Sequence, residues 1–222
     1  MQFCLGMKQK EIIEKAADFV KSKLENQGAG HDWWHVHQVW KLALKIAKKE
    51  KADKFIVQLG ALFHDIADWK FNDDADLGPK IAREFLSGMD VDENSIGEVC
   101  DIIKDISFKG AGVSTPMKTL EGKIVQDADR LEALGAMGIA RTFAYGGHKN
   151  FSIYEPDIKP VMHGSFEEYK SSKSSTINHF YEKLLLLKDR INTETGKKLA
   201  EKRHKFMERF LEQFFAEWNR KK

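Results

Sequence analysis

Residues 55–68 read F-I-V-Q-L-G-A-L-F-H-D-I-A-D, an almost uninterrupted apolar segment that ends in two adjacent metal-capable side chains, His64 and Asp65. The polar stretch 68–76 follows directly. Such a pattern predicts a buried helix that carries an imidazole and a carboxylate to the core side of a cavity, with a solvated loop after it. Taken alone, the pair also fits a helix-end histidine beside a solvated aspartate, because His-Asp is a common dipeptide.

Two further segments strengthen the metal interpretation. His35 lies upstream in G-H-D-W-W-H, and V-Q-D-A-D-R-L downstream offers Asp127 and Asp129. Two imidazoles and two carboxylates form a nitrogen and oxygen ligand set that suits Mn²⁺, Mg²⁺, Fe²⁺, Co²⁺ or Ni²⁺ better than a closed tetrahedral zinc site. This chemistry favours hydrolysis. Residues two apart on a helix diverge by about 200°, so only one of Asp127 and Asp129 can face a metal, and periodicity leaves that choice open.

The rest of the chain predicts an all-α protein. Apolar residues recur at helical spacing over 12–24 and 36–47, Asp53 is suited to cap the helix before His64, and a helix is expected over 93–106. A Gly/Ser/Pro-rich loop should occupy 107–119, and an irregular segment 146–164. Two long helices are expected near 175–192 and 194–219, with Thr193 as the cap between them. The aromatic residues of the last helix predict core packing or a dimer seam.

Composition sets the remaining bounds. The 222 residues are 42% hydrophobic and 32% charged, which is ordinary for one soluble globular domain. No apolar run approaches the roughly 18 residues that span a bilayer, no secretory signal begins the chain, and the two cysteines cannot form a disulfide framework, so we expect a cytoplasmic protein without a membrane partner. Residues 159–222 carry a net charge of +6, which could attract an anionic substrate, but no nucleic-acid-binding motif accompanies it.

The order His35, then His64-Asp65, then Asp129 resembles the H, H-D, D pattern of the HD-domain metal-dependent phosphohydrolases. The resemblance extends over roughly residues 10–218. It includes G-H-D-W-W-H-V, G-A-L-F-H-D-I-A-D, I-S-F-K-G, I-V-Q-D-A-D-R-L-E-A-L-G-A-M-G-I-A-R-T-F and N-H-F-Y-E-K-L-L. These segments look like the small bacterial branch of the family, some members of which are nucleoside-triphosphate pyrophosphatases.

The resemblance implies a single HD-type helical bundle over 1–222, with a core at about 10–145, an irregular loop at about 146–164 and additional C-terminal helices at about 175–219. It implies hydrolysis of (d)NTP to (d)NMP and pyrophosphate by attack of a metal-activated water on the nucleotide. The alternatives are a 5′-nucleotidase acting on (deoxy)nucleoside monophosphates and a non-catalytic nucleotide sensor. A homodimer is compatible with the pattern.

The resemblance also selects the site residues. His35, His64, Asp65 and Asp129 would bind one divalent ion, with Mn²⁺ as the first expectation. His37, two residues after His35, would face away and have a surface or packing role. No histidine lies between Asp65 and Asp129, whereas HD proteins with two metals use additional histidines there, so a mononuclear site is expected and oxygenase chemistry is disfavoured. Asp68 resembles the acidic residue that handles the proton of the attacking water. Cationic and imidazole candidates for the substrate phosphates are His31, Lys104, Lys109, Arg130 and Arg141.

Overall fold

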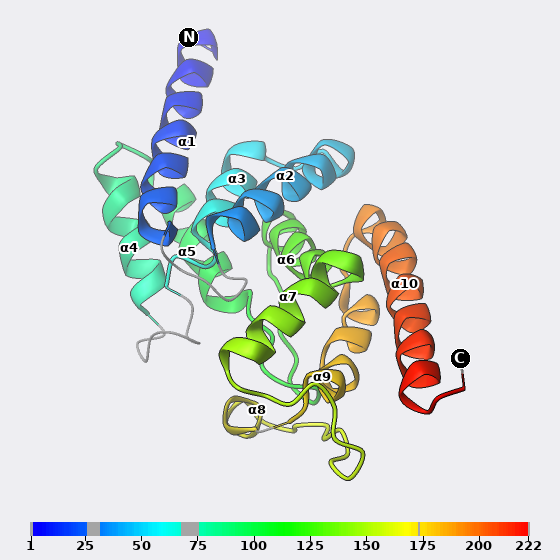
Figure 1. Ribbon diagram of the computed structural model, residues 1–222. Helices are drawn as coiled ribbons and strands as arrows, with labels where there is room; N and C mark the ends of the chain where they lie inside the picture. The colour runs from blue at the N-terminus through cyan, green and yellow to red at the C-terminus, as the bar shows by residue number, and fades with distance from the viewer. Residues whose placement is uncertain (1, 26–31, 68–75, 173, 222) are drawn as a thin grey trace. The chain divides into compact units, whose positions relative to one another are not determined.

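The computed structural model describes residues 2–25, 32–67, 76–172 and 174–221. Every element in these ranges is helical, so the all-α prediction is confirmed (Figure 1). Contacts divide the chain into two compact units. Unit 1 comprises Met1–Ser107 and Thr115–Ala128, and unit 2 comprises Phe108–Ser114 and Asp129–Lys222. The helix Leu120–Glu132 runs without a break across the boundary between Ala128 and Asp129. The single-domain assignment stays a prediction.

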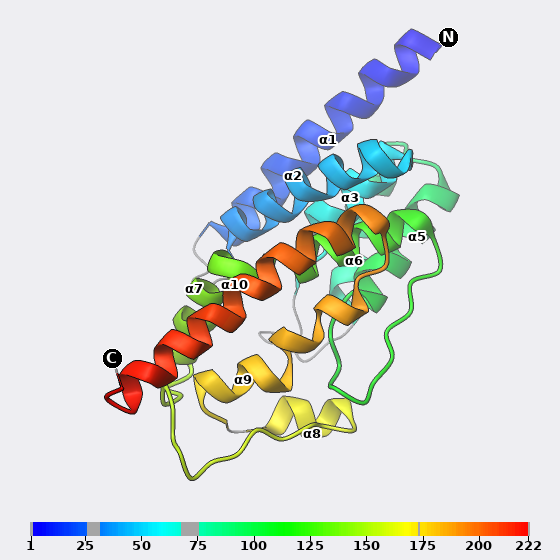
Figure 2. The same ribbon diagram turned by 90° about the vertical axis from the view of Figure 1, so that its right-hand side faces the viewer.

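Unit 1 is built around a short helix in which only Lys54 and Gln58 are not buried. Its helices are α1 (Gln2–Leu24), α2 (Trp33–Glu50), α3 (Lys54–Phe63), α4 (Leu77–Ser87), α5 (Glu93–Asp105) and most of α6 (Leu120–Glu132). Helix α3 packs against α1, α2 and α5, and both ribbon views show α2 alongside it (Figures 1 and 2). Residues 55–57 and 59–63 are all buried, because apolar side chains cover every face of this helix. The apolar segment therefore forms the centre of the unit.

Local capping explains where several helices of unit 1 begin. Asp53 is the N-cap of α3, as predicted, and its carboxylate accepts a hydrogen bond from the Phe55 amide at 2.7 Å. Asp92 caps α5 in the same way through the amide of Ser95. The loop between α5 and α6 lies where the sequence predicted it, and buried Gln126 holds its second half by donating to the carbonyl of Thr115 at 3.0 Å.

Unit 2 contains α7 (Gly135–His148), α8 (Phe166–Ser171), α9 (Thr176–Glu182), the 3-10 turns η1 (Leu184–Leu186) and η2 (Lys188–Arg190), and α10 (Glu194–Trp218). Helix α10 packs against α7 (Figure 2), and α7 also contacts α9. The irregular segment begins after His148, three residues later than predicted. The expected long helix over 175–192 is wrong, because α9 ends at Glu182 and the two 3-10 turns follow it.

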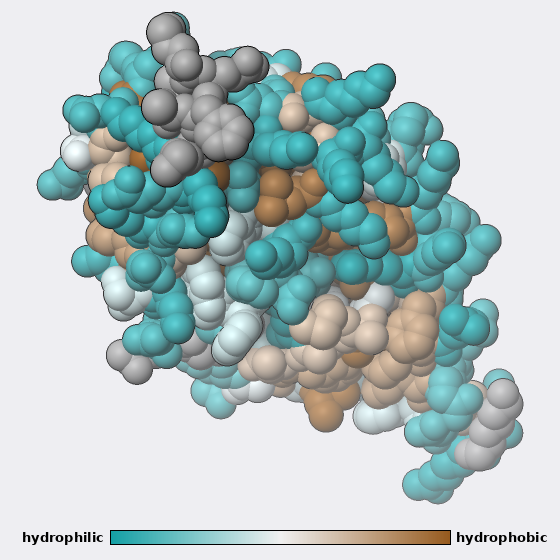
Figure 3. All heavy atoms as spheres, turned by 90° about the horizontal axis from the view of Figure 1, so that it is seen from above, coloured by the Kyte–Doolittle hydropathy of each residue, from teal (hydrophilic) through white to brown (hydrophobic). Residues whose placement is uncertain are grey.

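The aromatic side chains of α10 pack within unit 2. Phe210 stacks on Phe180 of α9 with ring centroids 5.7 Å apart, and Phe214 meets the ring of Tyr154 edge-on at 6.0 Å. Thr193 caps α10 through the amide of Gly196, which confirms its predicted role. On the face seen in Figure 3, hydrophilic residues predominate and apolar ones show between them. The core-packing interpretation of the aromatic stripe is thus supported for Phe210 and Phe214, whereas Phe206 and Trp218 are 43% and 47% exposed. Homodimer formation stays a prediction.

Candidate metal centre

His64 and Asp65 follow the last residue of the buried helix α3. His64 occupies the C-cap position and is 5% exposed, and the Asp65 side chain is 12% exposed. The surrounding apolar residues of α3 exclude water from one side of these groups. A histidine and a carboxylate in such surroundings need polar or ionic partners, because burial without them is costly.

One hydrogen bond fixes the tautomer of His64. Its Nδ1 atom lies 2.8 Å from the carbonyl oxygen of Ala61. A carbonyl oxygen only accepts, so Nδ1 carries a proton, and in the neutral imidazole Nε2 is then the nitrogen with the lone pair. A metal-binding histidine usually donates the N–H of its other ring nitrogen to a carbonyl or carboxylate oxygen, and this bond orients the ring. His64 is therefore prepared to offer Nε2 as a ligand.

His35 approaches His64 from the first turn of α2. The carboxylate of Asp32 caps this helix by accepting a hydrogen bond from the His35 amide at 3.0 Å, which fixes the backbone of the first turn. The His35 side chain is buried, and its Nε2 atom lies 3.3 Å from Nε2 of His64. The two imidazole nitrogens thus point at the same place.

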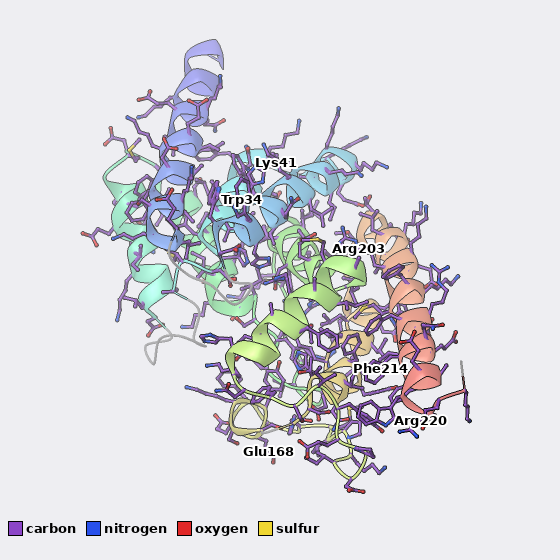
Figure 4. All side chains as sticks on the ribbon, viewed as in Figure 1. Trp34, Lys41, Glu168, Arg203, Phe214 and Arg220 are labelled. Atoms are coloured by element: carbon purple, nitrogen blue, oxygen red, sulfur yellow. The ribbon has the colours of Figure 1, made fainter. Side chains whose placement is uncertain are left out.

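His37 turns away from this place. Its ring contacts the indoles of Trp33 and Trp34, each with its centroid 5.8 Å away, and meets Trp40 edge-on (Trp34 is labelled in Figure 4). Burial, and then the charge of Lys41, lowers the pKa of His37. The structure thus agrees with the expectation that His37 has a packing role and leaves His35 to face the site.

A third candidate ligand atom within unit 1 is Oδ2 of Asp65. It lies 3.4 Å from Nε2 of His35 and 3.6 Å from Nε2 of His64. Ligands at about 2.1 Å from one ion are about 3.0 to 3.5 Å apart, so the separations of 3.3 to 3.6 Å among these three atoms are close to those of ligands around a single divalent cation. The residues present therefore fit a metal ion, with two nitrogens and one oxygen on one side of it.

The two aspartates of V-Q-D-A-D-R-L lie on α6. Asp127 is completely buried, and Asp129 is partly exposed. Two contacts inside unit 1 join the first part of α6 to α3 and its N-cap. Near the start of both helices, the Asp53 amide donates to Oε1 of Glu121 at 2.9 Å. Further along, a Cβ atom added to Gly60 would lie 3.3 Å from Cγ2 of Val125.

The remaining predicted residues are spread over both units. Lys104 of α5 forms an exposed ion pair with Asp76, with its Nζ 3.8 Å from Oδ1. Arg130 is buried, and its Nη1 atom donates to the carbonyl of Arg190. Arg141 lies half-buried on α7, and Lys109 is half-buried in the loop after α5. His31 and Asp68 lie outside the described residues.

Sequence reasoning missed Arg190, whose guanidinium donates to three backbone carbonyls of the loop that contains Lys109. No local signal could have found it, because its partners are 77 to 80 positions away and are main-chain atoms. Asp32 was also missed, although an aspartate immediately before an apolar helical pattern is a recognised start signal.

A family model described as the HD domain matches residues 33–134, the range that contains His35, His64, Asp65 and Asp129. The "Uncharacterized protein YpgQ" of Bacillus subtilis (strain 168) is 39% identical over 208 residues, which cover 93% of this chain and 94% of YpgQ. The chain belongs to the HD domain family.

Solved structures of other HD proteins agree with this assignment. An HD-superfamily hydrolase from Bacillus thuringiensis is 44% identical with a TM-score of 0.74, over 95% of this chain and 98% of its own. YpgQ of Bacillus subtilis, solved in complex with ADP, gives a TM-score of 0.75 and 34% identity over 95% of this chain and 96% of that one. These similarities support assigning the chain to the hydrolase class. In the described residues, no helix is long and apolar enough to cross a membrane.

Proposed function

We propose that this chain is a metal-dependent phosphohydrolase that converts (deoxy)nucleoside triphosphates to monophosphates and pyrophosphate. The observation that carries the proposal is the convergence of Nε2 of His35, Nε2 of His64 and Oδ2 of Asp65 at separations of 3.3 to 3.6 Å. Membership of the HD family, with its hydrolases, supports the reaction class. The ADP bound by YpgQ supports a nucleotide as the substrate.

The proposed metal ligands are His35, His64, Asp65 and Asp129, and the proposed ion is a single Mn²⁺. Asp129 is included because it occupies the last position of the H, H-D, D pattern that the sequence shares with the family. Within the described chain, His35, His64 and Asp129 also form a trio that could hold a metal ion. Asp127, two residues earlier and fully buried, would have a structural role.

A bound divalent ion supplies Lewis acidity and lowers the pKa of a coordinated water toward neutrality. The protein's own contribution is to orient its ligands and to exclude water, which the Nδ1 hydrogen bond of His64 and the apolar surface of α3 support. Asp68, three residues after Asp65, is proposed to accept the proton of the attacking water. Lys109, with Lys104, Arg130, Arg141 and His31 as further candidates, is proposed to contact phosphate oxygens.

Product analysis tests the proposed reaction. The purified protein is incubated with nucleoside mono-, di- and triphosphates and with Mn²⁺, Mg²⁺ or Co²⁺, and the products are separated by chromatography. The proposal expects a monophosphate and pyrophosphate in equal amounts from triphosphates. Inorganic phosphate as the first product, with monophosphates turned over faster than triphosphates, would assign a 5′-nucleotidase. Nucleotide binding without turnover under any of these metals would assign a sensor.

A further inference from the structure

Three carbonyl groups of one loop converge on a single guanidinium. Nη1 of Arg190 donates to the carbonyl oxygens of Gly110 at 3.3 Å and Val113 at 3.1 Å, and Nη2 donates to that of Ala111. The same guanidinium lies over the ring of Phe108, with its Cζ 4.9 Å from the ring centroid. Arg190 thus holds most of the 108–114 segment from one side.

The loop is fixed from a second direction by the backbone near residue 163. The amide of Gly112 donates to the carbonyl of His163 at 3.0 Å. Gly110 has a φ of 124°, where a side chain would be strained, and a Cβ there would come within 3.2 Å of the His163 and Ser165 carbonyls. All of these residues belong to unit 2, so the conformation of the loop is determined within that unit.

No carboxylate forms an ion pair with the positive charge of Arg190 in the described part of the chain. The partners of its guanidinium are neutral carbonyls and an aromatic ring. Burial lowers its pKa, but a guanidinium stays protonated at neutral pH. Lys109, the neighbour of Phe108 and Gly110, is half-buried and has no carboxylate partner in the described part of the chain. The ammonium of Lys109 therefore remains available to contact an anion, and the charge of Arg190 adds to the positive potential around the loop.

We infer that Arg190 is a positioning residue, which holds the 108–114 loop so that the ammonium of Lys109 can contact a phosphate of the substrate. The inference rests on the proposed nucleotide substrate. An arginine suits the task because its planar fork can serve three carbonyls at once, whereas a lysine offers one compact ammonium. Arg130 adds to the arrangement by donating to the carbonyl of Arg190 from the last turn of α6.

The test is a double-mutant cycle on the full-length protein with Mn²⁺. Arg190→Lys keeps the charge but removes the fork, and Lys109→Ala removes the ammonium. The loss of one charged phosphate contact should raise KM by about 10- to 100-fold in Lys109→Ala. A loosened loop should raise KM by about 10-fold in Arg190→Lys, with kcat and metal content close to those of the wild type. The double variant should be no worse than Lys109→Ala, because Arg190 acts through Lys109.

The matched control is Arg203→Lys. Arg203 lies on α10 (labelled in Figure 4) and also donates to a backbone carbonyl in unit 2, that of Leu131, but it does not touch the loop. The Arg203→Lys variant should leave KM unchanged. If the two losses in the cycle are additive, or if Arg203→Lys raises KM as much as Arg190→Lys does, Arg190 has only a general structural role and the inference is wrong.

Two measurements that need no turnover separate this inference from the proposed function. Hydrogen exchange of the 110–113 amides should accelerate in Arg190→Lys and stay unchanged in Arg203→Lys. The affinity for ADP with Mn²⁺ should fall in Arg190→Lys and in Lys109→Ala. If no nucleotide is hydrolysed but both results hold, the proposed reaction is wrong and the positioning role stands. Unchanged exchange, or ADP affinity that neither variant alters, overturns the positioning role even in an active enzyme.

Discussion

Nδ1 of His64 donates a hydrogen bond to the carbonyl oxygen of Ala61, one turn earlier in the same buried segment. This bond commits the proton of the imidazole to Nδ1 and turns the lone pair of Nε2 toward His35. A buried apolar helix thus does more than fill the core of unit 1. Its own main chain orients the first ligand of the proposed site.

His64→Ala should lose both bound metal and hydrolysis, because no other imidazole can replace Nε2 at that place. The same result is expected for Asp65→Ala. Elemental analysis and a turnover assay measure the two effects. His37→Ala is the control, since His37 packs among tryptophan rings, and it should keep the metal. One metal per chain in His64→Ala would contradict the ligand assignment.

Asp68→Asn should keep stoichiometric metal and a similar thermal midpoint but lower kcat by about 10²- to 10⁴-fold, because an amide keeps the size of the side chain and cannot accept the proton. Steady-state kinetics beside elemental analysis provides the measurement. A kcat near that of the wild type would make Asp68 an ordinary residue of the segment after α3. Loss of the metal would make it a ligand.

Gly146→Ala should destabilise unit 2. A Cβ atom at Gly146 of α7 would lie 2.3 Å from Oγ1 of buried Thr176, so either α9 or the side chain must move, at a cost of about 1–3 kcal/mol. Gly147→Ala is the matched control, because a Cβ there meets nothing within 4 Å, and it should be neutral or stabilising by about 0.5–1 kcal/mol. Denaturant unfolding measures both. Equal stabilities of the two variants would refute the close packing of α7 on α9.

Cys100 should react slowly with thiol reagents at pH 8. Its Sγ donates to the Pro79 carbonyl at 3.4 Å, and burial raises its pKa above the ordinary value of 9.0, with the charge of Arg83 opposing this. The neutral thiol is the form that the fold favours, so its contribution to stability is present below pH 9.0 and is lost as pH rises above that value. A Cys4→Ser variant isolates the group, and the same variant unfolded in guanidinium is the reference. Equal rates in both states would contradict the burial.

The parts of the fold that were predictable depend on local chemistry. The apolar run of α3, the cap residues Asp53 and Thr193, and the loop between α5 and α6 follow from side chains that act within a few positions. Helix α8 was missed, although S-F-E-E carries its signal, since Oγ of Ser165 accepts from the Glu168 amide at 3.2 Å.

The end of α9 could not be predicted in this way. The run 184–187 is four leucines, which favour a continuous helix, but Lys183 adopts a φ of −139° and a ψ of −61° and ends it. Leu184 and Leu187 are then buried at the three-residue spacing of 3-10 turns. Tertiary packing decides this break. The same turns bring Arg190 to a loop about 80 residues away, which no local pattern encodes.

The sequence supplied the candidate ligands of the site. The geometry of unit 1 brings three of them, His35, His64 and Asp65, close together. The choice between His35 and His37 follows from helix periodicity plus one packing cluster, which the structure provides. The choice of Asp129 over Asp127 rests on the family pattern and on the grouping of Asp129 with His35 and His64, which lie far away in the sequence.

Metal stoichiometry in Asp127→Ala and Asp129→Ala, measured by elemental analysis after loading with Mn²⁺, tests the central claim most directly. The claim predicts one metal per chain in the wild type and in Asp127→Ala, and loss of the metal together with hydrolysis in Asp129→Ala. Two metals per wild-type chain, or metal kept in Asp129→Ala and lost in Asp127→Ala, would contradict it.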